Sequence, residues 1–91
     1  MLYKINIANS FDKAWYDEKA LPMLADDIRE KVSALNLDID SHTKANLDIV
    51  LKRLKKAKKY RAFDKAWRDF YAIAEEIKLL IILEEFQSTP P

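Results

Sequence analysis

The stretch FDKAWRDFYAIAEEIKLLI, residues 63–81, has the most regular pattern in the chain. Its apolar side chains recur at intervals of three or four residues: Phe63, Ala66, Trp67, Phe70, Ile73, Ala74, Ile77, Leu80 and Ile81. This spacing places them on one face of an α-helix of about five turns. An amphipathic helix has to bury its apolar face against other elements. The stretch therefore predicts a helical protein in which residues 63–81 form the most regular helix.

Three more helices are expected upstream. The first begins near Phe11 with Asn9 or Ser10 as its N-cap, and its buried face is expected to hold Phe11, Ala14 and Trp15. The second begins at Pro22, because proline suits the first turn of a helix, and fades by Asn36. Its expected inward residues are Leu24, Ile28, Val32 and Leu35.

The third helix is expected to begin near Ser41, after the loop-forming residues 38–41. Its apolar face consists of Leu47, Val50, Leu51 and Leu54, with Ala57 at the edge. On the same face, Lys58 and Arg61 follow where core residues would be needed. This helix is therefore expected to end, or to leave the core, near residues 58–62.

These elements predict an all-α fold, a compact four-helix bundle-like single domain that covers residues 1–91. Residues 3–7, YKINI, alternate between apolar and polar side chains and allow a short N-terminal strand. The alternative is an α+β domain, in which this strand pairs with residues 77–83. The polar, proline-ended residues 87–91 are expected to form a frayed tail.

The chain contains no glycine and no cysteine. The absence of glycine excludes the glycine-rich phosphate loop, the dinucleotide-binding turn and the GxSxG nucleophile elbow. It also means that no helix can end on the usual C′ glycine. The absence of cysteine excludes disulfides, thiolate metal sites and a cysteine nucleophile. Together with an N-terminus that does not resemble a secretory signal, this predicts a cytoplasmic protein with no transmembrane segment.

The pentapeptide Phe-Asp-Lys-Ala-Trp occurs twice, at residues 11–15 and 63–67. The repeat could be a motif displayed twice for a partner, or two helices could use the same aromatic pair to fill a core. The core interpretation is favoured here, because Phe, Ala and Trp lie on the face that a bundle buries.

Charge is unevenly distributed along the chain. Residues 52–68 carry nine basic side chains and one acidic side chain, although the net charge of the whole chain is only +1. The candidate contact residues for a partner or for nucleic acid are Lys52, Arg53, Lys55, Lys56, Lys58, Lys59 and Arg61. As a phosphate-binding surface this basic segment would make contacts without base readout, because lysine is a point charge. It could equally bind an acidic protein, or simply keep the surface solvated and offset a helix dipole.

Candidate catalytic and metal-binding residues form no convincing set. Asp38, Asp40 and the single histidine, His42, could approach a cation, but the segment fails the EF-hand pattern, and the same residues are typical of a helix start. Asp26, Asp27 and Glu30 share a helix face, where Asp27 can instead pair with Lys31. We therefore expect no catalytic site, no metal and no cofactor, and a small all-helical enzyme is the second alternative.

Residues 79–83, LLIIL, add apolar surface beyond the regular stripe of the last helix. In a domain of this size, either the last helix lies at the centre of the fold, or its extra apolar face contacts a second chain. The candidate oligomer interface is Leu79, Ile82 and Leu83, which predicts a homodimer. The sequence as a whole predicts a small non-catalytic regulatory or inhibitory interaction protein that binds a protein partner, with a nucleic-acid-binding protein as the first alternative.

Overall fold

The computed structural model describes residues 2–84. In chain order the elements are strand β1 (Tyr3–Asn6), helix α1 (Ala8–Tyr16), a 3₁₀ turn η1 (Glu18–Ala20), helices α2 (Leu21–Ala34), α3 (Ser41–Lys56) and α4 (Tyr60–Glu76), and strand β2 (Leu79–Ile82). The predicted helical bundle with a short N-terminal strand is confirmed. The expected frayed tail, residues 87–91, lies outside the described residues.

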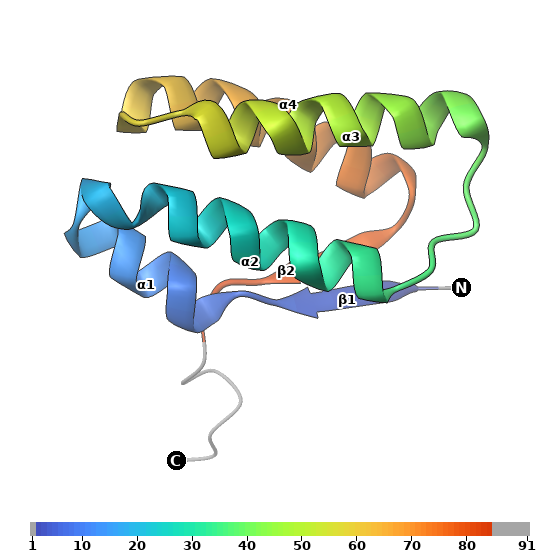
Figure 1. The fold of residues 1–91 in the computed structure, drawn as a ribbon. Coiled ribbons are helices and arrows are strands. Elements are labelled where there is room, and N and C mark those ends of the chain that lie inside the picture. The colour runs from blue at the N-terminus through green and yellow to red at the C-terminus, as the bar shows by residue number, and fades with distance from the viewer. Residues whose placement is uncertain (1, 85–91) are drawn as a thin grey trace, which may run out of the picture.

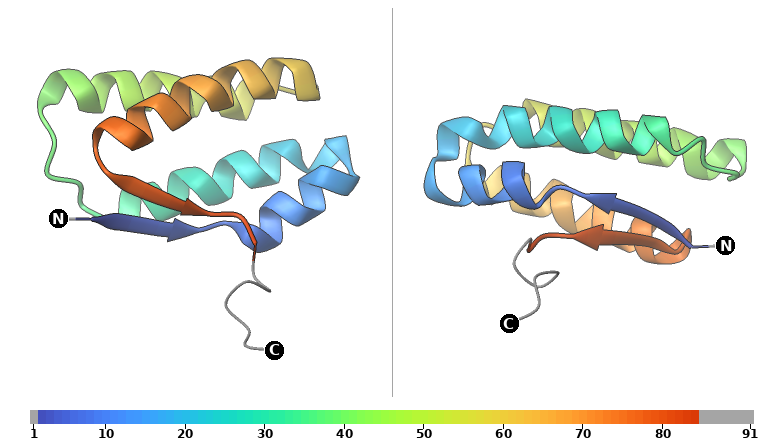
Figure 2. Two further views of the ribbon diagram at one scale, coloured as in Figure 1. Left: turned by 180° about the vertical axis from the view of Figure 1, so that it is seen from behind. Right: turned by 90° about the horizontal axis from the view of Figure 1, so that it is seen from below.

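The elements form layers. Helices α3 and α4 lie at the top of Figure 1, α1 and α2 lie below them, and the two strands run along the base. The strands are parallel, with Tyr3 beside Leu79 and Asn6 beside Ile82. Seen from below in Figure 2, β1 lies between α2 and β2. The N-terminal strand thus pairs with the C-terminal segment that the α+β alternative named.

The predicted extent of the last helix is wrong at its C-terminal end. Helix α4 ends at Glu76 and does not continue to Ile81. Lys78 adopts φ 60, which is left-handed backbone, and turns the chain into β2. The physical reason is that residues 79–83 are all apolar. A helix would place them all around its axis and could bury only one face, whereas a strand beside β1 buries alternate side chains.

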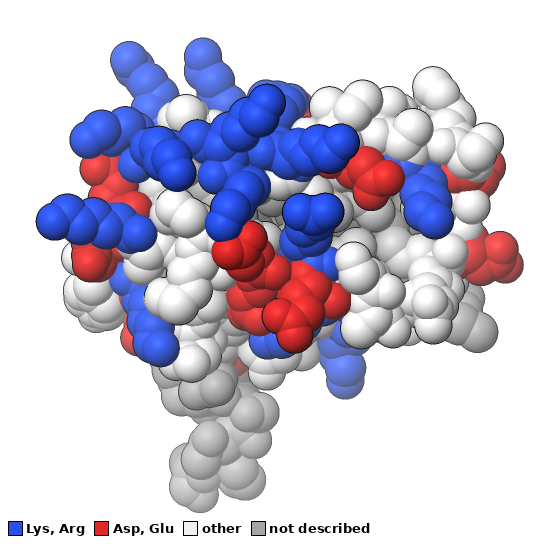
Figure 3. Space-filling model, viewed as in Figure 1, with Lys and Arg blue, Asp and Glu red and all other residues white. Residues whose placement is uncertain are grey.

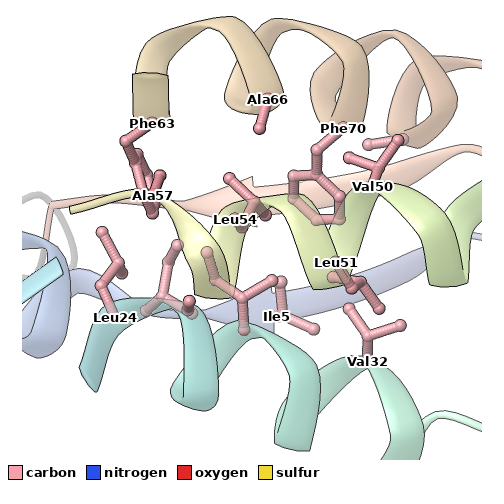
Figure 4. Packing of buried hydrophobic residues seen from close by; sticks show 14 of the residues in the cluster. Ile5, Leu24, Val32, Val50, Leu51, Leu54, Ala57, Phe63, Ala66 and Phe70 are labelled. Atoms are coloured by element: carbon pink, nitrogen blue, oxygen red, sulfur yellow. The ribbon is translucent and has the colours of Figure 1, made fainter. Parts of the chain in front are cut away.

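Every layer contributes side chains to the hydrophobic core. The largest fully buried side chains are Phe70, Ile7, Leu24, Ile28 and Leu54. Figure 4 shows Phe63, Ala66 and Phe70 pointing from α4 towards the side chains of α3, with the α2 residues on the opposite side. The apolar faces predicted for α2 and α3 are buried as expected, apart from Leu35, which is half-buried.

Because the chain has no glycine, other residues form the ends of its helices. Asn36 takes the left-handed conformation, with φ 50, after α2, and asparagine tolerates that region better than most residues. Asp40 caps α3 by accepting the Thr43 N–H at 2.7 Å. Helix α1 begins earlier than predicted, at Ala8, because the Asn6 side chain accepts the Ala8 N–H at 3.0 Å. Ser10, an expected N-cap, is instead buried and donates to Asp27 at 2.6 Å.

Candidate functional site

The two copies of Phe-Asp-Lys-Ala-Trp face each other across an open groove of about 520 Å³. The first copy lies on α1 and the second on the N-terminal half of α4. The lining residues are Phe11, Ala14, Trp15, Leu21, Leu24, Tyr60, Phe63, Asp64 and Trp67. All but Asp64 are apolar or aromatic, so the groove suits apolar side chains of a ligand.

The aromatic rings of the groove form a connected series that continues to Phe70 in the core. Trp67 lies 6.4 Å from Phe11 and 6.4 Å from Phe63 between ring centroids, and 5.7 Å from Phe70. Phe11 in turn lies 6.1 Å from Trp15. Aromatic pairs at these distances attract each other beyond the area that they bury. Trp67 therefore joins the two copies, and Trp15 is the outermost ring of the series.

Tyr60, the first residue of α4, lines the groove and connects its two walls. Its hydroxyl donates to the Ala14 carbonyl at 2.7 Å and lies 3.3 Å from the Trp15 carbonyl. Its backbone N–H donates to the Glu18 carboxylate at 2.8 Å. The carboxylate thus satisfies a free N–H at the start of α4, where negative charge is also favourable for the helix dipole. These bonds fix the spacing between α1 and α4.

The expectation that both tryptophans belong to the core is wrong for Trp15, which is 69% exposed. Helix α1 ends one residue later, and Asp17 is extended, so no further helical turn shields the indole ring. Trp67 is half-buried and Phe63 is buried. The repeat is therefore partly core and partly surface. Sequence reasoning missed Tyr60 and Leu21 as groove residues, and only the repeat itself could have indicated that the two segments meet.

The basic segment, residues 52–61, covers the C-terminal end of α3, the connection to α4 and the first residues of α4. Its seven candidate contact residues are all exposed: Lys52, Arg53, Lys55, Lys56, Lys58, Lys59 and Arg61. Figure 3 shows blue side chains gathered over this upper part of the molecule, with acidic side chains beneath them. The structure therefore brings these residues together on one end of the α3–α4 layer.

Three of these cations have carboxylate partners. Arg53 pairs with Asp69 at 2.6 Å, Lys55 with Asp26 at 2.7 Å and Lys59 with Glu18 at 3.5 Å. Within residues 2–84, the other four make no ion pair: Lys52, Lys56, Lys58 and Arg61. The net positive surface is consequently smaller than the sequence count suggests. It is concentrated around the α3–α4 connection, next to Tyr60 of the groove.

The acidic candidates Asp26 and Asp27 each pair with a different cation. Asp27 pairs with Lys31 at 3.2 Å, as the sequence predicted, and also accepts the Ser10 hydroxyl. Asp26 pairs with Lys55 on the neighbouring helix. These contacts tie α1, α2 and α3 together.

The loop before α3 holds the other candidate ligands. The hydrogen bonds from Thr43 lower the pKa of Asp40 below its usual value of 3.8. His42 is exposed and lies 3.5 Å from the Asn46 side chain. Among residues 2–84, no three His, Asp or Glu side chains are close enough to share a metal ion. Asp38 contributes its backbone N–H to the Tyr3 hydroxyl at 3.0 Å.

The candidate interface residues lie in and after β2 and not on a helix, so the predicted helical interface is wrong. Leu79 is buried, whereas Ile82 and Leu83 are half-buried. Leu80 is 47% exposed on the face of the sheet that points away from the helices. The structure thus places an apolar strand at the edge of the molecule.

Comparison with known proteins adds no further information: no family model, no curated protein and no solved structure matches the chain. In the part of the chain that the structure describes, no helix is both long and apolar enough to cross a membrane.

Proposed function

We propose that this protein is a small non-catalytic regulatory or inhibitory interaction protein that holds a protein partner in the groove between α1 and α4. The observation that carries the proposal is the open aromatic groove, whose outer wall is a tryptophan that is 69% exposed. Tryptophan and tyrosine are the residues that most often dominate the binding energy of protein interfaces. An exposed indole ring beside an apolar groove is otherwise unfavourable in water.

The basic segment next to the groove supports a partner with acidic side chains. Tyr60 lines the groove and lies between Lys59 and Arg61 in the basic segment. A bound segment with aromatic or large aliphatic side chains could fill the groove, while its acidic side chains approach Lys58 and Arg61. Such charge complementarity speeds association and fixes the orientation of the bound segment. The partner is therefore proposed to be an acidic protein segment with apolar anchor residues.

A peptide-display selection against the full chain tests this proposal. The probe is a random library of twelve-residue peptides, and the selected peptides are synthesised and titrated by tryptophan fluorescence and calorimetry. Peptides enriched in aromatic or leucine residues together with Asp or Glu are expected. Trp15→Ala should weaken their binding at least about tenfold, because an interface tryptophan commonly contributes more than 1.4 kcal/mol.

Tyr16→Ala is the matched control. Tyr16 is the next residue, is 82% exposed and does not line the groove. Its substitution should leave peptide binding unchanged. Equal losses for Trp15→Ala and Tyr16→Ala, or selected peptides without apolar anchors, would contradict the proposal.

The second candidate function is binding of nucleic-acid phosphates by the basic segment. The observation in its favour is the group of four cations without a carboxylate partner among the described residues: Lys52, Lys56, Lys58 and Arg61. A salt titration of binding to heparin and to duplex DNA measures this function, because each neutralised phosphate adds to the salt dependence. Binding that survives physiological salt and falls in the double variant Lys56→Glu/Lys58→Glu would support it. Elution well below physiological salt would rule it out.

A further inference from the structure

Among the residues that the structure describes, strand β2 has a partner strand on only one of its two edges. The Tyr3 N–H donates to the Lys78 carbonyl at 3.1 Å, and the Ile7 N–H donates to the Ile82 carbonyl at 3.0 Å. Because successive residues of a strand point their backbone groups to opposite sides, the groups of Leu79, Ile81 and Leu83 face the other edge. Within residues 2–84 the sheet has only two strands, so no strand pairs with this edge. In Figure 2, seen from below, β2 lies at the outer side of the sheet.

The outer edge of β1 is protected differently. The Lys31 side chain extends from α2 and donates to the Asn6 carbonyl at 2.6 Å. Folded proteins commonly protect exposed strand edges with lysine side chains or covering elements. Residues 79–83 of the other strand contain no charge and no proline. The β2 edge therefore has the features that favour pairing with another strand.

We propose that two copies of this chain associate by pairing β2 with β2 of the partner subunit, forming a continuous four-stranded sheet. A two-fold axis between identical strands makes them antiparallel. This contact uses the residues of the predicted interface, Leu79, Ile82 and Leu83, but as a strand edge and not as a helix face. It is independent of the groove between α1 and α4.

Two features select one register. The free backbone groups belong to odd-numbered residues, so odd-numbered residues must oppose odd-numbered ones. With Ile81 on the axis, Leu79 opposes Leu83 of the partner subunit, and Lys78 opposes Glu84 of the partner subunit. Lys78 and Glu84 of each chain then form two ion pairs, one at each end of the uncharged residues 79–83. If one strand is shifted by two residues, Lys78 lies opposite an apolar side chain instead. Charge complementarity thus favours a second copy as the occupant of this edge.

The same register covers exposed apolar surface. Leu80 is 47% exposed and Ile82 is half-buried on the sheet face that points away from the helices. In the dimer, Leu80 lies directly opposite the partner's Ile82, so the two side chains pack across the new strand boundary. The added strands also extend a sheet that has only two strands within residues 2–84.

Analytical ultracentrifugation of the full chain over a micromolar concentration series tests whether the dimer forms. A dimer is expected for the natural sequence, and Leu80→Lys should weaken it at least about tenfold, because it places charge in the apolar contact. Ile49→Lys is the matched control, since Ile49 is 57% exposed on α3 and should leave the dimer intact. Trp15→Ala should also leave it intact, which separates the dimer from groove binding. A monomer at every concentration would overturn the proposal.

Cysteine crosslinking tests the register, and the chain has no cysteine of its own to interfere. The variants Leu80→Cys and Ile82→Cys are purified separately, mixed and oxidised. In the proposed register, Leu80 and the partner's Ile82 form a non-hydrogen-bonded pair, because the backbone groups of even-numbered residues face β1. The Cα atoms of such a pair lie about 4.5 Å apart, which a disulfide can bridge. The mixed crosslink is therefore expected to exceed either self-crosslink.

Charge reversal provides an independent readout. Lys78→Glu and Glu84→Lys should each weaken the dimer, and the double variant should restore it. A self-crosslink that predominates, or a double variant as weak as the single ones, would overturn the register.

Discussion

The two copies of Phe-Asp-Lys-Ala-Trp have the same five side chains but pack to different extents. The alanines agree: Ala14 and Ala66 are both buried, because both helices press this position against the rest of the protein. The phenylalanines and tryptophans differ. Phe63 is 7% exposed and Trp67 is half-buried, whereas Phe11 is half-buried and Trp15 is 69% exposed. An identical local sequence has thus produced a core segment in α4 and a largely exposed segment in α1.

The difference lies in what surrounds each copy. Helix α4 has 17 residues and packs along α3, so its second turn meets core side chains. Helix α1 has only 9 residues and ends one residue after Trp15. The first copy consequently supplies the outer wall of the groove, and the second copy supplies its inner wall. The motif determines a helical face, and the length and position of each helix determine how much of that face is buried.

The largest expected effect is on stability, and it separates the two phenylalanines. Phe63→Ala should lower the free energy of unfolding by about 3–5 kcal/mol, because it leaves a cavity in the core. Phe11→Ala should cost about half as much or less, because its ring is partly in water. Urea denaturation followed by circular dichroism measures both. Equal losses would show that the two copies pack equally well.

The tryptophans should differ by about 2 kcal/mol in the same experiment. Trp67→Ala removes contacts with three aromatic rings, so a loss of about 2–3 kcal/mol is expected. Trp15→Ala should stay within about 0.5 kcal/mol, as is usual for exposed residues.

Fluorescence gives an independent check, because these are the two tryptophans of the chain. Trp67→Phe leaves only the exposed indole, and its emission should be red-shifted and readily quenched by iodide. Trp15→Phe leaves Trp67, which should emit at shorter wavelength. The reverse order would contradict the burial difference.

The comparison also shows how far the sequence predicts this molecule. The core faces of α2 and α3 follow from helical spacing, and Pro22 and Asp40 indicate where these helices begin. The spacing in residues 63–81 overextends α4, because Leu80 and Ile81 fit the helical stripe as well as they fit a strand. Their pairing with β1 depends on a contact between the two ends of the described chain, which local periodicity does not contain.

The candidate site is predicted only in part, for the same reason. The repeat and the basic segment are visible in the sequence, but their meeting at Tyr60 depends on how α1 and α4 pack. Carboxylates on η1, α2 and α4 could have paired with many cations, so the ion pairs of Arg53, Lys55 and Lys59 are also not predictable from spacing. Asp27 with Lys31 was predictable because both lie on one helix, four residues apart.

Tyr60 links the two copies, and its hydroxyl should contribute about 1 kcal/mol to stability. Tyr60→Phe removes the hydrogen bond to the Ala14 carbonyl and keeps the ring that lines the groove. The thermal midpoint should fall by several degrees, in line with the size of the chain. Tyr71→Phe is the control, since Tyr71 is exposed on the same helix. An unchanged midpoint for Tyr60→Phe would show that α1 and α4 are held together without this bond.

The smallest expected effect comes from an ion pair within α4 that has no counterpart in the first copy. Asp64 pairs with Arg68 four residues later at 3.0 Å, whereas Asp12 has Tyr16 at the corresponding position. Both partners of the α4 pair are well exposed, so Arg68→Ala should cost only about 0.3–0.5 kcal/mol. Tyr16→Arg should gain about the same amount in α1, because it creates the equivalent pair with Asp12. Both effects on the free energy of unfolding should vanish in about 1 M salt, where the screening length is about 3 Å. A gain that persists in high salt would mean that removal of the exposed Tyr16 ring, and not the new ion pair, stabilises α1.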